Sequence, residues 1–460
     1  MFWTLIKKEI HDHILSARFT VSMILALIFL IGSTAMLAMD GTWTGRQLYT
    51  GYKLKDHLYT NKYSWYWMNR DLPALRVLAT GLDEELSLNA NSEAAMGPQF
   101  ENNRQFVNNP NRYLFSQLDF VFFFNIVGSL LAFVFTYDTI SGEYGRGTLR
   151  LVLVNSISRP LLLSAKFVGS YLSLIVSLLP ALISVILLLY LMPNVNFRPS
   201  DWAATLFLFL LALLYLSVFC AIGLFGSCLT KHPKTTLTVL MVLWVVMVLV
   251  IPNFSPFLAA YLRPTPTVYE VHENMQRLSG DIWQQSREEI EGFIQERGGD
   301  SEALSDAEKQ TIGEIRAKSE RKQMNLSVGK AAAIRQDFIN AVEAQADMNL
   351  SISLISPSAA FVYLATDVAN TGILSEWDFR RAVMRYRHQY AEHVNNYIEE
   401  TGDYEILQRI LKADPPDFVP PKFFLSDVIS THFDLLVVLL LYSVMFFFAS
   451  QVLFIRRPLT

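Results

Sequence analysis

Residues 202–229 read WAATLFLFLLALLYLSVFCAIGLFGSCL, a long run without a single charged side chain. About 20 consecutive apolar residues are enough for a helix to cross the hydrocarbon core of a bilayer. A helix is the favoured solution because lipid offers no hydrogen-bond partner to an open backbone. This run therefore predicts a transmembrane helix and places the chain among the integral membrane proteins.

The rest of the chain repeats this pattern. Of its 460 residues, 52% are hydrophobic and 17% are charged, whereas a soluble domain carries about 25% charged residues. Residues 19–39 could be a cleaved signal peptide, but their apolar core exceeds the ~7–15 residues of such a peptide and no A-x-A-like site follows. We therefore predict an all-α polytopic membrane protein with six transmembrane helices, at 19–39, 118–137, 167–192, 202–229, 235–252 and 433–455.

Basic residues predict the orientation of these helices. They cluster in every second connection, and connections of this kind lie in the cytoplasm. The clusters contain Lys7, Lys8 and Arg18, then Arg146, Arg150, Arg159 and Lys166, then Lys231 and Lys234, and finally Arg456 and Arg457. Segments 1–18, 138–166, 230–234 and 456–460 are therefore expected to be cytoplasmic, and the short loop 193–201 to lie outside. Both termini would be cytoplasmic in a multi-pass protein of the cell membrane.

Two long segments, 40–117 and 253–432, fall outside in this topology. Together they would form one mainly α-helical extracytoplasmic domain built from two insertions. The first reads as loop and short helix, with a hairpin near 58–67. The second is expected to begin at Pro252 and Pro256, since proline residues often interrupt helices. Neither segment contains a cysteine, which is compatible with a bacterial inner-membrane protein that uses no disulfide.

The second long segment carries the stronger helical pattern. Apolar residues recur every three or four positions from Val271 to Phe293 and from Ile334 to Val342, as in amphipathic helices. Residues 298–300 read GGD and would separate the two helices of a long hairpin. A further helix is predicted from Ser375 to about Lys412.

Residues 350–368 leave a second topology open. They are apolar enough to form a seventh span, which would place Arg456 and Arg457 outside, against the orientation rule. A segment packed in the external domain, or lying at the outer membrane surface, is the expected alternative.

Residues 1–17 are typical of an amphipathic helix that lies on a membrane. Trp3, Ile6, Ile10 and Ile14 share one face of such a helix. Membrane lipid is its expected contact. The predicted interface residues on this helix are Trp3, Lys7, Lys8 and Glu9.

Patterns associated with catalysis are missing from the sequence. It contains no G-x-x-x-x-G-K-[ST] phosphate loop and no H-E-x-x-H zinc pattern. Predicted spans also lack the buried charged groups that ion-coupled transporters use. We therefore expect no catalytic residue, no metal site, no cofactor of its own and no nucleic-acid partner. Energy for any transport would have to come from another chain.

The most informative motif follows the second span, where residues 137–160 read YDTISGEYGRGTLRLVLVNSISRP. Its glycines permit tight backbone turns, and Gly147 is expected to need a conformation that a side chain would strain. Thr148 could cap a short helix over 149–154. Glu143 would pair with a cation such as Arg146. A basic amphipathic element at the membrane face is suited to dock on a soluble partner.

This stretch resembles the ABC-2-type permeases, and among them the multi-copper-enzyme maturation group. That group has the pattern D-x-I-S-G-E-x-x-x-G-T-L-R-L-x-L-x-N-x-x-x-R, followed by a lysine at the start of the third span. The matching residues here are Asp138, Ile140, Ser141, Gly142, Glu143, Gly147, Thr148, Leu149, Arg150, Leu151, Leu153, Asn155, Arg159 and Lys166. The likeness covers 109–191 most strongly and the two external segments least.

The resemblance implies a non-catalytic membrane subunit of an ATP-driven ABC transporter. A separate cytoplasmic ATPase would bind ATP and Mg²⁺, and a second permease copy or a homologous permease would complete the dimer. Residues 141–154 would be the coupling helix. The implied coupling residues are Asp138, Ser141, Gly142, Glu143, Arg146, Gly147, Thr148, Leu149, Arg150 and Arg159. The transporter would export or flip a substrate, or act on an envelope partner of its external domain.

Two other functional classes remain open. A membrane-anchored scaffold or sensor would use its external helices to bind a partner. An intramembrane enzyme would need polar groups that converge from facing spans, and the sequence indicates none.

Overall fold

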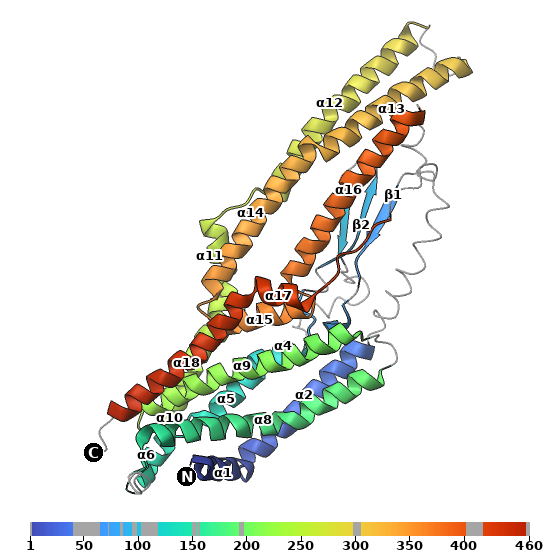
Figure 1. The fold of residues 1–460 in the computed structure, drawn as a ribbon. Helices are drawn as coiled ribbons and strands as arrows, with labels where there is room; N and C mark the ends of the chain where they lie inside the picture. The colour runs from blue at the N-terminus through green and yellow to red at the C-terminus, as the bar shows by residue number, and fades with distance from the viewer. Residues whose placement is uncertain are drawn as a thin grey trace.

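The chain folds into a bundle of long helices that carries a second helical domain at one end (Figure 1). In this computed structural model, α1 (Phe2–Ile14), α6 (Ser141–Arg146) and the final turn of α18 (Phe433–Arg456) lie together at the opposite end. We refer to that end as the α6 end. The residues that the structure describes are 2–39, 65–71, 73–82, 86–93, 99–102, 118–149, 154, 157–192, 197–297, 305–401 and 417–456.

Six helical stretches are long and apolar enough to cross a membrane, which confirms the predicted fold class. Four of them are single helices, and two contain π-helical turns. The single helices are α2 (Ala17–Met39), α8 (Arg159–Leu191), α9 (Pro199–Leu229) and α18. The second stretch joins α4 (Phe120–Phe122), the π-helical turn η3 (Phe123–Gly128) and α5 (Ser129–Thr136). The fifth joins α10 (Pro233–Trp244), the π-helical turn η4 (Val245–Val250) and α11 (Ile251–Leu262).

Helix α9 lies at the centre of the bundle, where it contacts α5, α8, α10 and α18. Its side chains from Leu216 to Leu224 are nearly all buried. Gly223 and Gly226 let neighbouring helices approach closely, because a Cβ atom at either position would overlap Thr136 or Leu240. Small residues at helix contacts are typical of membrane bundles, where close packing replaces the hydrophobic effect.

We call the second domain the head. It contains α12 (Val268–Gln295), α13 (Asp306–Val328), α14 (Lys330–Ser353) and α16 (Ile373–Thr401). Capping boxes begin α12 at Thr267 and α13 at Ser305, where each side chain accepts a hydrogen bond from the N3 backbone amide. Helix α12 packs against α13 and α14. Gly329 separates α13 from α14, and residues 298–300 of the predicted hairpin lie outside the described part.

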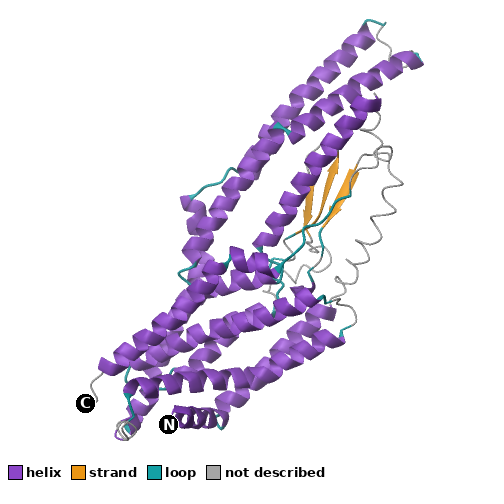
Figure 2. Cartoon of the chain, in the orientation of Figure 1, coloured by secondary structure: helices purple, strands orange, loops and turns teal. Residues whose placement is uncertain are grey.

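Three short antiparallel strands cover one side of α16 (Figure 2). Strand β1 (Trp65–Asn69) pairs with β2 (Ser87–Glu93), which pairs with β3 (Gln99–Asn102). The sequence indicated only a hairpin near 58–67. Residues 65–67 pair instead with residues 91–93, because β1 joins a strand from much later in the segment, and residues 58–64 lie outside the described part.

The fifth spanning stretch is longer than predicted. We expected it to end at 252, but the helix continues to Leu262. Pro252 does not stop it, because the helix is continuous from Pro233 and the carbonyl oxygen of Met247, which a residue with an amide hydrogen at 252 could reach in a π-helical turn, accepts from the Ser356 hydroxyl instead.

Residues 350–368 do not form a seventh span. Helix α14 ends at Ser353, and α15 (Pro357–Val368) is a separate buried helix that packs on α9 and α18 at the head end of the bundle (Figure 1). At 1.5 Å per residue its length is about 18 Å, too short for a hydrocarbon core of about 30 Å. Helix α17 (Leu425–Thr431) then connects to α18.

Candidate functional site

The predicted coupling residues that the structure describes lie between α5 and the first residue of α8, at the α6 end. They divide into two groups by burial. Ser141, Gly142 and Leu149 are buried, whereas the residues from Gly145 to Thr148 are exposed. We call residues 145–148 the tip. Arg150 lies outside the described residues, so the short helix predicted over 149–154 is not described as a whole.

Backbone amides hold α6 on the bundle. The amides of Ile140 and Ser141 both donate to the Ser227 hydroxyl of α9, at 2.9 and 3.0 Å. The Ser141 hydroxyl in turn donates to the carbonyl oxygen of Tyr137 at 2.9 Å. Because the first amides of a helix have no partner within the helix, Ser227 satisfies two donors that would otherwise be unpaired. A single hydroxyl thus fixes where α6 begins.

Lys166 is the electrostatic centre of this end. Its Nζ lies 2.6 Å from Oε1 of Glu9 in α1 and 2.7 Å from Oε1 of Glu143 in α6. Only 4% of the Lys166 side chain is exposed. One cation therefore joins three elements: α1, α6 and α8. A buried ion pair of this type tolerates the loss of one partner poorly, because the remaining charge stays desolvated.

A second ion pair fixes the beginning of the turn. Arg18 of α2 makes a bidentate contact with Asp138, with nitrogen–oxygen distances of 2.9 and 2.7 Å. Its guanidinium also donates to the Tyr137 hydroxyl at 3.2 Å and lies 5.0 Å from the centre of that ring. Bidentate arginine–carboxylate pairs are both strong and directional. The turn is therefore tied to α2 as well as to α1, α8 and α9.

The tip projects from this anchored base. Gly147 ends α6 with φ at 74°, in the left-handed region, as the sequence predicted. A Cβ atom at Gly147 would meet nothing within 4 Å, so the glycine serves the backbone and not the packing. Arg146 and Thr148 flank it and are both exposed. The tip is thus free to contact another molecule.

Helix α1 packs on α8, so part of its surface contacts protein. Ile6 is 1% exposed, and the Nε2 atom of His13 lies 3.2 Å from the Ser170 hydroxyl. A Cβ atom at Gly169 would lie 2.6 Å from the Cβ atom of Glu9, so only glycine permits this approach. Burial lowers the pKa of His13, even though Glu9 and Asp138 act in the opposite direction. Trp3, Lys7 and Lys8 are exposed.

Two of the predicted coupling residues have roles inside the protein. Leu149 packs in a buried apolar cluster with Leu162 and Phe454. Arg159 donates to the carbonyl oxygens of Phe454 and Ile455, at 3.2 and 2.8 Å, and so caps the end of α18.

The sequence prediction for Glu143 was wrong in its partner and in its burial. We expected an exposed pair with Arg146, with a basic residue of the amphipathic helix over residues 1–17, or with a basic residue of the ATPase. The cation is Lys166, which lies 23 positions further along the chain and one helix away. Sequence reasoning also missed Arg18 and Ser227. The family pattern includes a lysine at the start of the third span, and this was the signal that could have identified Lys166 as the partner. No local pattern marks Ser227.

A second polar cluster lies at the head end, where α15 fits against both π-helical turns. The Ser358 hydroxyl donates to Oδ1 of Asn125 in η3 at 2.7 Å, and the Tyr215 hydroxyl donates to the same oxygen at 2.9 Å. The Ser356 hydroxyl donates to the carbonyl oxygen of Met247 in η4. In a π-helical turn this carbonyl oxygen would accept from the amide five residues later, at position 252. Pro252 has no amide hydrogen, so it cannot make that bond. Helix α15, which follows α14 and precedes α16 of the head in the chain, is therefore joined to the spans by hydrogen bonds at two places.

Within the described part of the chain, no three His, Cys, Asp or Glu side chains gather closely enough to hold a metal ion. These residues form instead a buried base of ion pairs, an exposed tip, and a polar seat for α15. Asn125 and Met247 link that seat to the second and fifth spanning stretches.

Comparison with known families gives one result that covers almost the whole chain. Residues 3–459 match the model described as ABC-2 family transporter protein. A search of curated proteins returned no match. The match includes α1, the turn at the α6 end, all six candidate spans and the head. The chain therefore belongs to the ABC-2 family of transporter proteins, whose members are membrane permease components of ABC transporters.

Proposed function

We propose that the tip is the surface through which a separate cytoplasmic ATPase drives this permease. The observation that carries the proposal is the contrast between residues 145–148, which are exposed, and their base, which is fixed by the Lys166 ion pairs. A force applied to the tip would reach α1 and α8 directly. A coupling element needs this combination, because a flexible base would absorb the motion.

Orientation is part of the proposal. The α6 end faces the cytoplasm and the head faces outward, in the inner membrane of a bacterium. The basic residues near the α6 end support this assignment, since Arg18, Lys166 and Lys231 all lie there. The ATPase would carry ATP and Mg²⁺. Cysteine labelling of intact cells tests the orientation: position 146 should be protected, and position 287 on α12 should react.

We further propose that the active unit is a dimer of permeases and that the chain belongs to the multi-copper-enzyme maturation group. The motif from Asp138 to Arg159 supports the group. Within such a unit, the head would receive motion through α15 and through the continuous helix that ends at Leu262. Export, flipping, or work on an envelope partner are the activities that this arrangement suits.

The experiment is reconstitution of the permease with its ATPase in nanodiscs. We expect ATP hydrolysis to be stimulated by the permease, and the variants Arg146→Glu and Thr148→Pro to lose that stimulation while keeping the unfolding temperature of the parent. Arg316→Glu on α13 is the matched control. Equal stimulation by the tip variants would contradict the proposal and would favour a membrane-anchored scaffold whose head alone is functional.

A further inference from the structure

A cleft of about 610 Å³ opens where the head meets the bundle. Its walls include the first turn of α9, the 3₁₀ helix η1 (Ala74–Val77) and the segment 419–424 that leads into α17. Cavities that hold small molecules typically measure about 300–1,000 Å³. The cleft is therefore large enough for a ligand the size of a lipid headgroup.

Neighbouring aromatic residues indicate that the cleft lies at the surface of the bilayer. The first turn of α9 lines it, so it lies at the head end of the fourth spanning stretch. Trp202 belongs to that turn, and Tyr190, near the adjoining end of α8, is 76% exposed. Trp and Tyr side chains are enriched at the level of the lipid headgroups. A lipid of the leaflet at the head end is therefore within reach of the cleft.

The cleft carries charges of both signs. Arg198 and Lys422 are its cations, and both are exposed. Asp71 and Asp201 are its carboxylates. Asp201 accepts from the backbone amide of Arg198 at 2.8 Å, whereas Asp71 and Lys422 form no ion pair or side-chain hydrogen bond within the described part of the chain. Asp71 is exposed as well, so one carboxylate and one ammonium group are available to a ligand.

Apolar side chains lie beside these charges. Val419 and Phe424 line the cleft and are 69% and 55% exposed. Apolar surface of this kind gains free energy when another apolar group removes it from water. The cleft therefore combines a charged part, suited to a headgroup, with an apolar part, suited to an acyl chain.

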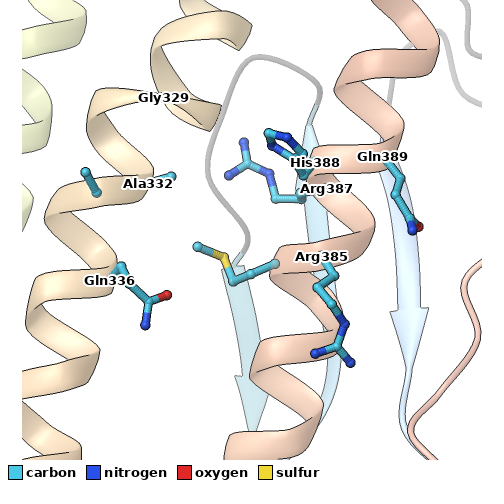
Figure 3. A pocket seen from close by; sticks show the side chains of 9 residues that line it. Gly329, Ala332, Gln336, Arg385, Arg387, His388 and Gln389 are labelled. Carbon is cyan, nitrogen blue, oxygen red and sulfur yellow. The ribbon is translucent and has the colours of Figure 1, made fainter.

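The cavity between α14 and α16 provides a contrast. It measures about 560 Å³, and Figure 3 shows Arg387 and His388 beside each other on α16, across the opening from Ala332 of α14. Arg385 lines it too, and no Asp or Glu is among the described residues that do so. This cavity lacks the charges of both signs that the cleft has, and the exposed Arg385 is a control position that does not line the cleft.

We propose that the cleft binds a zwitterionic phospholipid whose headgroup carries a primary ammonium group. Arg198 and Lys422 contact its phosphate, and Asp71 accepts from its ammonium group. Guanidinium and ammonium groups both form charge-assisted hydrogen bonds with phosphate oxygens. Val419 and Phe424 contact its acyl chains. The site depends neither on the proposed coupling function nor on which side of the membrane the head faces.

The test uses the purified full-length protein in detergent micelles, with dihexanoyl phosphatidylethanolamine as the probe. The matching choline and glycerol phospholipids are the comparisons. We expect a saturable rise in unfolding temperature with the ethanolamine lipid and weaker binding of the other two. Lys422→Gln should weaken binding of the ethanolamine lipid at least about 10-fold, as expected for loss of a charge-assisted hydrogen bond. Arg385→Gln, in the cavity between α14 and α16, should bind like the parent.

Asp71→Asn tests recognition of the ammonium group separately. This variant should lose the preference for the ethanolamine lipid over the choline lipid, because the carboxylate that accepts from the primary ammonium group is gone. Both substituted side chains are exposed, so the ligand-free unfolding temperature should stay that of the parent. O-phosphoethanolamine binding as tightly as the lipid would overturn the assignment to a lipid. Saturation by no phospholipid, equal binding by Lys422→Gln, or an unchanged preference in Asp71→Asn would each overturn the proposal.

Discussion

Lys166 of α8 and Glu143 of α6 form an ion pair across 2.7 Å, in which 4% of the lysine side chain and 15% of the glutamate side chain are exposed. The same ammonium group contacts Glu9 of α1 at 2.6 Å. Two carboxylates from separate elements thus share one buried cation.

We predict that Lys166→Met destabilises the protein by about 3–5 kcal/mol, the usual effect of removing one partner from a buried ion pair. Thermal unfolding of the purified chain measures this. Lys166→Arg should retain most of the stability, and the triple variant with Glu9→Gln and Glu143→Gln should recover much of it, since no uncompensated carboxylate remains. A Lys166→Met protein as stable as the parent would show that the ion pairs are not formed.

Gly147 offers a variant that separates coupling from folding. At φ 74°, a β-branched residue is strained by about 1–2 kcal/mol, and nothing else obstructs it. Gly147→Val should therefore insert into the membrane normally but lose ATPase stimulation. Gly147→Asn should keep it, because asparagine tolerates left-handed backbone. The measurement is ATP hydrolysis in nanodiscs. Equal stimulation of the ATPase by the two variants would refute this prediction.

Some parts of this fold could be predicted from the sequence, and others could not. Span positions follow from runs such as 202–229, because lipid leaves a helix as the only solution for so long an apolar segment. The end of the fifth span could not be predicted, since proline reads as a helix breaker whereas Pro252 occupies the first turn after a π-helical turn. Strand β1 pairs with residues that lie 20 to 28 positions later in the chain, and no local pattern encodes that register.

In the candidate site, too, some features could be predicted from the sequence and others could not. Gly147 was predictable because its conformation is local. The Glu143 partner was not, since it depends on how α6 packs against α8. Ser227 illustrates the limit most clearly, because a serine in an apolar run reads as a helix-packing residue and gains its role only from two amides brought to it by the fold.

His13 predicts a pH dependence of stability. Burial lowers its pKa in the folded protein below the ordinary value of 6.5. The unfolded chain therefore binds the proton more readily, and the contribution of His13 is complete above pH 6.5 and falls as pH decreases below it. The loss of stability between pH 7.5 and 5.5 should be smaller in His13→Gln than in the parent. Identical pH profiles in chemical unfolding would contradict this prediction.

The seat of α15 predicts a coupled pair of residues. Asn125→Leu removes the acceptor of the Ser358 hydroxyl, at a cost of about 1–3 kcal/mol, whereas the Tyr215 hydroxyl keeps the backbone carbonyl oxygen of residue 125 at 3.1 Å. Amide hydrogen exchange in α15 should accelerate, and a double-mutant cycle with Ser358→Ala should be non-additive. Ser351→Ala, whose exposed hydroxyl bonds only to its own helix, is the control. Additive effects of the two substitutions on stability would show that Asn125 and Ser358 do not interact.

Site-specific photo-cross-linking from position 146 tests whether the tip contacts an ATPase. A photoreactive amino acid replaces Arg146 in cells, and mass spectrometry identifies the cross-linked chain. We predict a cytoplasmic protein that contains a G-x-x-x-x-G-K-[ST] phosphate loop, and no such product from position 287 of α12. Cross-links from position 146 to lipid alone, or to the same proteins as position 287, would contradict the account.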